Sequence, residues 1–163
     1  MINIVLVEPE IPQNAGNIVR TCAATNSKLY MVKPLGFELS DKYYKRAGLD
    51  YFDLSNIEVV DSFDQIYNAN KDKQFYFAST KSQKTYADVQ YPDGCFIVFG
   101  KESFGLRESL LREHYDKCIR IPMISGTRSL NLSNSVAIIV YEALRQNGFD
   151  NMQETGNLTN RED

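Results

Sequence analysis

Three short polar segments contain the residues of this chain whose types and spacing could do chemistry. They span residues 12–20, 99–106 and 121–134, and each carries amides, hydroxyls or paired glycines close to an apolar run. Each apolar run has the composition of a buried strand, and ligands of open parallel sheets bind beyond the carboxyl ends of the strands. The sequence therefore predicts a ligand site among these three segments.

The first segment leads into a predicted helix that carries a polar face. Asn17 and Arg20 fall on one side of that helix, whereas Ile18 and Cys22 fall on the side expected to meet the core. An arginine in this position is either a solvated surface residue or, with Asn14 and Asn17 nearby, part of a binding site. Both interpretations stay open at this stage.

The second segment, residues 99–106, contains Gly100 and Gly105. Glycine lets the backbone approach a ligand closely, but the same spacing also occurs in ordinary turns.

The third segment precedes an apolar helix and holds more polar side chains than one helix N-terminus needs. A single N-cap uses one such side chain, and this segment offers four: Ser129, Asn131, Ser133 and Asn134. The surplus is equally consistent with a ligand site and with local capping.

Several common kinds of site are excluded by the inventory. His114 is the only histidine, and it lies at a predicted helix end, where a solvated or capping cation is favoured. Hydrolase triads are therefore disfavoured. The chain has no HExxH or CxxC spacing, no GxxxxGK[ST] loop and no GxGxxG after its first strand. We expect no metal site and no ordinary dinucleotide site.

The elements around these segments alternate between short apolar runs and stretches of helical period, which predicts an α/β fold with a mostly parallel sheet. A helix is expected from an N-cap at Asn14 to about Asn26, and Ser62 with Gln65 forms a potential capping box. The last helix carries Val136 to Leu144 at helical spacing and ends before Gly148. The predicted strands are Ile2–Val7, Leu29–Val32, Ile57–Val60, Phe75–Ala78, Cys95–Phe99 and Cys118–Ile121.

The composition fits one globular domain. The 163 residues are 43% hydrophobic, which supplies a core over residues 1–150, whereas residues 151–163 are expected to form a polar, flexible tail. The net charge of -3 disfavours nucleic-acid coating by bulk charge. A local cluster such as Lys42, Lys45 and Arg46 either meets phosphate or is a solvated face.

The location of the protein is predicted from its cysteines and its N-terminus. Cys22, Cys95 and Cys118 are odd in number and lie in apolar runs, so we expect buried, reduced thiols. The chain shows no leader segment and no apolar stretch of membrane-spanning length. A cytoplasmic protein without a membrane association is therefore expected.

Taken together, the polar segments resemble the three motifs of the SPOUT methyltransferases, and specifically the small branch that methylates the wobble ribose of tRNA. The similarity is carried by residues 8–20 (EPEIPQNAGNIVR), residues 98–106 (VFGKESFGL) and the stretch from Ile119 to Glu142. Residues 46–51 (RAGLDY) also resemble that branch. The resemblance covers nearly everything from Met1 to about Gly148.

This resemblance implies a doubly wound α/β domain whose C-terminal segment forms a deep trefoil knot around the cofactor pocket. The implied cofactor is S-adenosylmethionine, and the implied substrate is the ribose 2'-hydroxyl of nucleotide 34 in the tRNA anticodon loop. It further implies a homodimer, with the knot region and the final helix at the interface. Without an added RNA-binding domain, two subunits would supply the RNA surface.

The family's functional residues carry over position by position. Arg20 corresponds to the catalytic arginine, with Ser129 and Asn131 as further catalytic candidates. Asn17, Arg46 and Tyr141 are candidates for substrate binding, although Tyr141 is equally readable as a packing residue. The implied cofactor contacts are Ala78, Gly100, Ile121, Ser129 and Leu130.

The chemistry of methyl transfer limits what Arg20 can do. A guanidinium keeps its proton up to about pH 12, so it is a poor general base. We expect Arg20 to orient the 2'-hydroxyl and a neighbouring phosphate while phosphate or solvent takes the proton. Tyr43, Tyr44 and Tyr51 could stack on bases of a single-stranded loop.

Three other functions remain compatible with the sequence. One is a methyltransferase for another tRNA position or for rRNA, another is an RNA-binding protein that keeps the pocket without catalysis, and a third is a small-molecule enzyme with a nucleotide cofactor.

Overall fold

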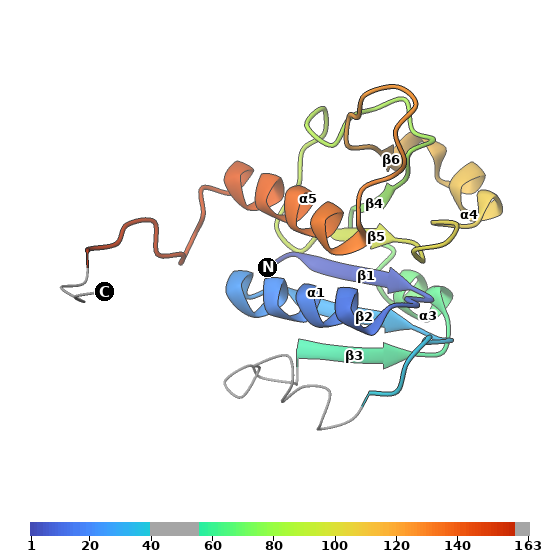
Figure 1. The fold of residues 1–163 in the computed structure, drawn as a ribbon, viewed down its shortest axis with the longest axis horizontal. Coiled ribbons are helices and arrows are strands. Elements are labelled where there is room, and N and C mark those ends of the chain that lie inside the picture. The colour runs from blue at the N-terminus through green and yellow to red at the C-terminus, as the bar shows by residue number, and fades with distance from the viewer. Residues whose placement is uncertain (40–55, 159–163) are drawn as a thin grey trace.

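The computed structural model describes residues 1–39 and 56–158, and within them the chain forms one twisted parallel sheet with helices on both faces. Every strand pair recorded in this sheet is parallel, and the order is β3-β2-β1-β5-β4-β6 (Figure 1). The strands are β1 (Asn3–Val7), β2 (Lys28–Val32), β3 (Ile57–Val60), β4 (Phe75–Ala78), β5 (Phe96–Phe99) and β6 (Cys118–Ile119). The predicted α/β class and the predicted strand positions are confirmed, with β6 shorter than expected.

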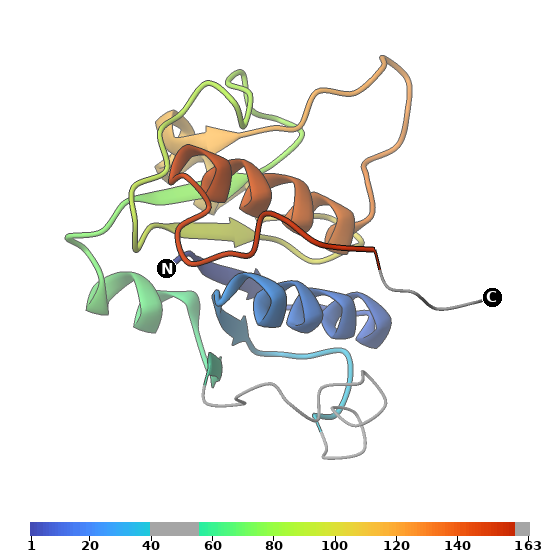
Figure 2. The same cartoon turned by 90° about the vertical axis from the view of Figure 1, so that its left-hand side faces the viewer.

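Alternating side chains of the strands divide the core into two layers. Ile4 and Leu6 of β1 belong to a cluster that includes the apolar faces of α1 (Pro12–Thr25) and α5 (Leu132–Gln146). Val5, on the opposite face, belongs to a second cluster with α3 (Phe63–Ala69) and α4 (Glu108–Glu113). The two views of the fold show α1 and α5 side by side over one face of the sheet (Figure 2). Residues from both ends of the chain therefore meet on this face.

The ends of the helices correct part of the sequence-based prediction. Helix α1 begins at Pro12 rather than at an Asn14 cap, because proline needs no hydrogen-bond partner for its nitrogen at the first helical position. Ser62 precedes α3 without a side-chain capping bond, and Gln65 instead accepts a hydrogen bond from the Asp61 backbone nitrogen at 3.1 Å. The predicted capping box is therefore wrong. The end of α5 is confirmed, since Gly148 follows the helix with a φ of 69°.

The three cysteines are buried and free, as the sequence predicts. Burial raises the pKa of Cys22 and of Cys95 to about 12, so these thiols stay protonated. No helix among the described residues is long and apolar enough to span a membrane.

His114 does follow the last residue of α4, but the expectation of a solvated side chain is wrong. The residue is only 6% exposed, and its ring stacks on Phe77 at 4.6 Å between centroids. Burial lowers the pKa of His114 and outweighs the opposing effect of the Glu113 carboxylate. The neutral imidazole is thus a packing group of the core.

The strand order reverses between β1 and β5. From β1 the chain adds β2 and β3 on one side, whereas β5, β4 and β6 lie on the other. The loops that follow β1 and β5 leave the sheet in opposite directions at such a point, and the space between them is where ligands of open parallel sheets bind.

Candidate functional site

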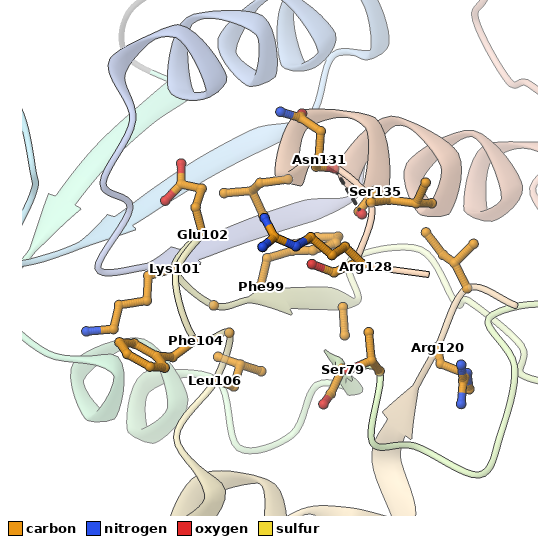
Figure 3. Close-up of a pocket in the computed structure, with 18 of the residues that line it drawn as sticks. Ser79, Phe99, Lys101, Glu102, Phe104, Leu106, Arg120, Arg128, Asn131 and Ser135 are labelled. Carbon is orange, nitrogen blue, oxygen red and sulfur yellow. Dashed lines mark hydrogen bonds between the residues drawn. The ribbon is translucent and has the colours of Figure 1, made fainter. Parts of the chain in front are cut away.

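A cavity of about 610 Å³ lies beyond the carboxyl ends of β4, β5 and β6. All three polar segments contribute to its wall, through Ile11 and Asn14, through residues 99–106 and through residues 128–132. Residues 78–81, at the carboxyl end of β4 and just beyond it, complete the wall (Figure 3). Cavities that bind small ligands have volumes of roughly 300 to 1,000 Å³. The predicted meeting of the three segments in one site is confirmed.

The Glu102 carboxylate holds the first and second segments together. One of its oxygens accepts a hydrogen bond from the Glu10 nitrogen at 2.8 Å. The other accepts from the Ile11 nitrogen at 3.2 Å and from the Asn14 side chain at 3.0 Å. Backbone N–H groups at the start of a helix favour a nearby negative charge. Glu102 therefore fixes the start of α1 against the loop after β5.

Asn14 extends this connection to the third segment. Its side-chain oxygen accepts a hydrogen bond from the Asn131 amide at 2.9 Å. The Asn131 oxygen in turn accepts from the backbone nitrogens of Ser133, at 2.9 Å, and of Asn134, at 3.3 Å, and so caps α5. One chain of side-chain hydrogen bonds thus runs from Glu102 through Asn14 and Asn131 to the start of α5.

Gly100 lets the loop after β5 fold back on itself. A Cβ atom at this position would lie 2.0 Å from the Gly105 carbonyl carbon and 2.1 Å from the Leu106 nitrogen. The Gly105 nitrogen donates to the Lys101 carbonyl at 2.8 Å and closes the turn. The close approach expected of this glycine is therefore an approach to its own chain, which shapes the wall of the cavity.

Two glutamates that precede the first segment, Glu8 and Glu10, fix the same loop from outside. The Glu8 carboxylate accepts a hydrogen bond from the Arg107 guanidinium at 2.5 Å and another from the Lys101 ammonium at 3.3 Å. The Glu10 carboxylate accepts from the Ser103 hydroxyl and from the Ser103 nitrogen, both at 2.9 Å. These two hydrogen bonds lower the pKa of Glu10. The loop after β5 is thus held at several points along its length.

The residues predicted to bind a cofactor all lie in the cavity wall. They come from the ends of three strands and from the third segment: Ala78, Gly100, Ile121, Ser129 and Leu130. Asn131 lies there as well. Ser129 is exposed and makes no hydrogen bond with a described residue, whereas Asn131 is engaged in capping.

The candidates for catalysis and substrate binding on the helices lie elsewhere. Asn17 and Arg20 on α1 and Tyr141 on α5 are exposed and are not among the described residues that line the cavity. Arg20 lies six residues beyond Asn14, which is about 9 Å along a helix axis. Arg46, together with Lys42, Lys45, Tyr43, Tyr44 and Tyr51, falls outside the described residues.

Two residues of the cavity wall were not singled out from the sequence. Phe104 is 83% exposed in the segment that contains Gly100 and Gly105. The neighbouring Gly105 is the only local feature of the sequence that indicates a turn exposing this ring. Arg128 makes no hydrogen bond or ion pair within the described chain, and its side chain extends across the cavity (Figure 3). The described residues contain no group of three or more histidine, cysteine, aspartate or glutamate residues that could hold a metal ion.

Several known proteins are similar to this chain over more than nine-tenths of its length. A tRNA (cytidine(34)-2'-O)-methyltransferase of Saccharophagus degradans is 44% identical over 150 residues, which are 91% of this chain and 97% of that protein. A solved structure from Bacillus anthracis has a TM-score of 0.88 at 43% identity and covers 95% of this chain and 100% of its own. A second, described as giving structural insights into the 2-OH methylation of C/U34 on tRNA, has a TM-score of 0.84 at 39% identity, over 91% and 97% of the two chains.

The family model described as the SpoU rRNA Methylase family matches residues 1–141, a range that contains every strand, every helix but the end of α5, and all three cavity segments. This chain therefore belongs to the SpoU rRNA Methylase family.

Proposed function

We propose that this protein transfers a methyl group from S-adenosylmethionine to the ribose 2'-hydroxyl of nucleotide 34, the wobble position of the tRNA anticodon loop. The observation that carries the proposal is the sequence similarity of this chain to a protein named for this reaction. The two chains are 44% identical over almost their full length. The solved structure concerned with C/U34 methylation supports it at the level of the fold.

The cavity wall suits the proposed cofactor. Ala78, Ile121 and Leu130 are partly or fully exposed and offer apolar surface for an adenine ring, and the exposed Ser129 hydroxyl is available for a hydrogen bond. The predicted contacts at Ala78, Gly100, Ile121, Ser129 and Leu130 hold the cofactor. When bound, S-adenosylmethionine supplies a methyl group that its sulfonium already activates.

Arg20 binds and orients the ribose. Its guanidinium donates to the 2'-hydroxyl oxygen and to a neighbouring phosphate, and so stabilises negative charge as that oxygen becomes a nucleophile. Because arginine keeps its own proton, phosphate or solvent takes the hydroxyl proton. Asn131 serves mainly by fixing the start of α5, and therefore the third segment, against the cavity. Asn17, Arg46 and Tyr141 contact the RNA.

A homodimer accounts for the position of Arg20. The side chain lies beyond the cavity of its own subunit, so a second copy brings an arginine, a cavity and additional RNA surface together. The apolar side chain of Ile138, 36% exposed on α5, supports an interface through this helix.

The proposed trefoil knot is supported by contacts of residues 79–94, the connection between β4 and β5. At its middle, the Tyr86 nitrogen donates to the Arg120 carbonyl, just beyond β6, at 2.8 Å. Closer to β5, the Tyr91 carbonyl accepts a hydrogen bond from the side chain of Asn147, which follows α5, at 2.8 Å. The chain that runs from β6 to α5 therefore has to pass close to this connection.

The domain comprises residues 1–150, with residues 151–163 as a tail. Because its proposed substrate is tRNA, the enzyme acts in the cytoplasm.

An rRNA ribose is the second candidate target, since the matching family is described by rRNA methylation. The two are separated by supplying purified tRNA and rRNA that lack methylation, each with labelled cofactor. Methyl transfer to tRNA alone supports the proposal, and transfer to rRNA alone replaces it.

The role of Arg20 is tested by comparing Arg20→Ala and Arg20→Lys. Arg20→Ala should abolish turnover, and Arg20→Lys should restore little, because lysine lacks the planar pair of donors. Calorimetric titration should give nearly unchanged affinity for S-adenosylmethionine in both variants. A large loss of cofactor affinity would contradict the assignment.

A further inference from the structure

Phe104 places an aromatic ring in solvent at the mouth of the cavity. The residue is 83% exposed and belongs to the loop after β5 that forms the wall (Figure 3). A single exposed apolar side chain is common on protein surfaces and by itself means little. The way in which the loop is held, and what surrounds the ring, are more informative.

The exposed ring does not result from a loose loop. On one side of Phe104, Ser103 is bonded to the Glu10 carboxylate through both its nitrogen and its hydroxyl, each at 2.9 Å. On the other side, the Gly105 nitrogen donates to the Lys101 carbonyl at 2.8 Å. The residues on both sides of Phe104 are thus fixed, so the ring is presented from a preorganised turn. Preorganisation of this kind lowers the entropic cost of binding.

One cationic group lies beside the ring, and a second lies in the same cavity. The Lys101 ammonium lies 5.9 Å from the centre of the Phe104 ring, within the range of a cation–π contact. Arg128 extends across the same cavity and has no partner in the described chain. An apolar aromatic surface bordered by positive charge matches a ligand that combines a flat ring with a phosphate. A nucleotide of a single-stranded RNA loop has this composition.

We infer that Phe104 is a stacking platform for a nucleobase of the RNA loop, next to the ribose that enters the cavity. The inference rests on the proposed function and adds to it a residue that contacts the substrate. Tyr43, Tyr44 and Tyr51, the stacking candidates from the sequence, lie outside the described residues, so Phe104 is an independent candidate for base recognition. The surroundings favour RNA over a second protein chain, because a protein interface at this point would bury the Lys101 ammonium together with its Glu8 partner.

The test uses an anticodon stem–loop RNA with the fluorescent base 2-aminopurine in its loop, because stacking quenches the fluorescence of this base. Phe104→Leu keeps an apolar side chain but removes the ring, and should bind the RNA about tenfold more weakly and lose the quenching. Phe104→Tyr keeps the ring and should restore both. Tyr115→Leu removes another exposed aromatic ring, outside the cavity wall, together with the 3.1 Å hydrogen bond from its hydroxyl to the Lys81 carbonyl, and should bind as the unaltered protein does.

The outcomes separate this inference from the proposed function. Unaltered RNA affinity in Phe104→Leu, or failure of Phe104→Tyr to restore binding, would overturn the stacking platform. So would a change of oligomeric state in Phe104→Leu, since the ring would then be a contact between subunits. Methylation of tRNA by the unaltered protein is measured in parallel, and its absence would count against the proposed function instead.

Discussion

The side-chain amide of Asn131 donates a hydrogen bond of 2.9 Å to the side-chain oxygen of Asn14, 117 positions earlier in the chain. Asn14 stands in the first turns of α1 and Asn131 caps α5, so this bond joins the starts of the two helices that cover one face of the sheet. Asn14 also donates to Glu102. The cavity therefore depends on a connection between three distant segments.

Replacement of Asn14 by alanine should destabilise the fold. Asn14 is 5% exposed, and its loss removes one donor from the Glu102 carboxylate and the acceptor of the Asn131 amide. The expected decrease in the free energy of unfolding is about 2 kcal/mol, measured by urea denaturation. Asn17→Ala, at an exposed position on the same helix, should change it by less than about 0.5 kcal/mol. Equal stability of the two variants would contradict the role of Asn14.

Gly100→Ala should deform the cavity wall. The added methyl group would overlap the backbone of Gly105 and Leu106, which cannot move aside as a flexible side chain can. We expect a loss of about 2 kcal/mol in the free energy of unfolding, together with weaker cofactor binding in calorimetry. Gly156→Ala is the matched control, because nothing lies within 4 Å of its Cβ position. Cofactor affinity in Gly100→Ala equal to that of the control would show that the close approach is not needed.

The position of His114 predicts how stability depends on pH. Burial lowers the pKa of His114 in the folded protein, so between that value and about 6.5 the unfolded chain binds more protons than the folded one. The free energy of unfolding should therefore fall as the pH drops below about 6.5. His114→Phe keeps a ring against Phe77 but cannot titrate, and its stability should fall less between about pH 7 and pH 5. The same dependence in both proteins would exclude this residue as the cause.

Arg128 should contribute to RNA affinity through its charge. It extends across the cavity without a partner in the described chain, so a phosphate can accept a pair of parallel N–H hydrogen bonds from its guanidinium. In Arg128→Gln, RNA should bind more weakly, and the slope of the logarithm of affinity against the logarithm of salt concentration should be shallower by about 1. Arg112→Gln, on α4 and outside the cavity wall, is the control. An unchanged slope in Arg128→Gln would exclude a phosphate contact.

Much of this fold can be predicted from the sequence, because strands buried on both faces appear as continuous apolar runs. The range 75–78 of β4, whose first three residues are buried, agrees with the prediction residue for residue. The range 57–60 of β3 agrees as well, although this edge strand is only partly buried and contains Glu58. The location of the site is also predictable, since polar segments beyond parallel strands meet at one edge of the sheet. The strand positions and the location of the site depend only on local composition and on the spacing of apolar residues.

The remaining features depend on contacts between distant segments. Asn14 has the residue type of an N-cap, but its side chain is used by Glu102 and Asn131, and neither partner can be identified from spacing. His114 lies at a helix end, as expected, yet Phe77 buries it there. The face on which Arg20 stands is predictable, whereas its separation from the cavity is not, because that depends on where α1 begins relative to β5.

Mapping of the methylated nucleotide tests the central claim most directly. The protein is incubated with labelled S-adenosylmethionine and tRNA that lacks modification, and the product is digested and analysed by mass spectrometry. The account predicts one added methyl group, on the 2'-oxygen of nucleotide 34, and none in the Arg20→Ala variant. Methylation of a base, methylation at another nucleotide, or no transfer to any ribose would contradict it.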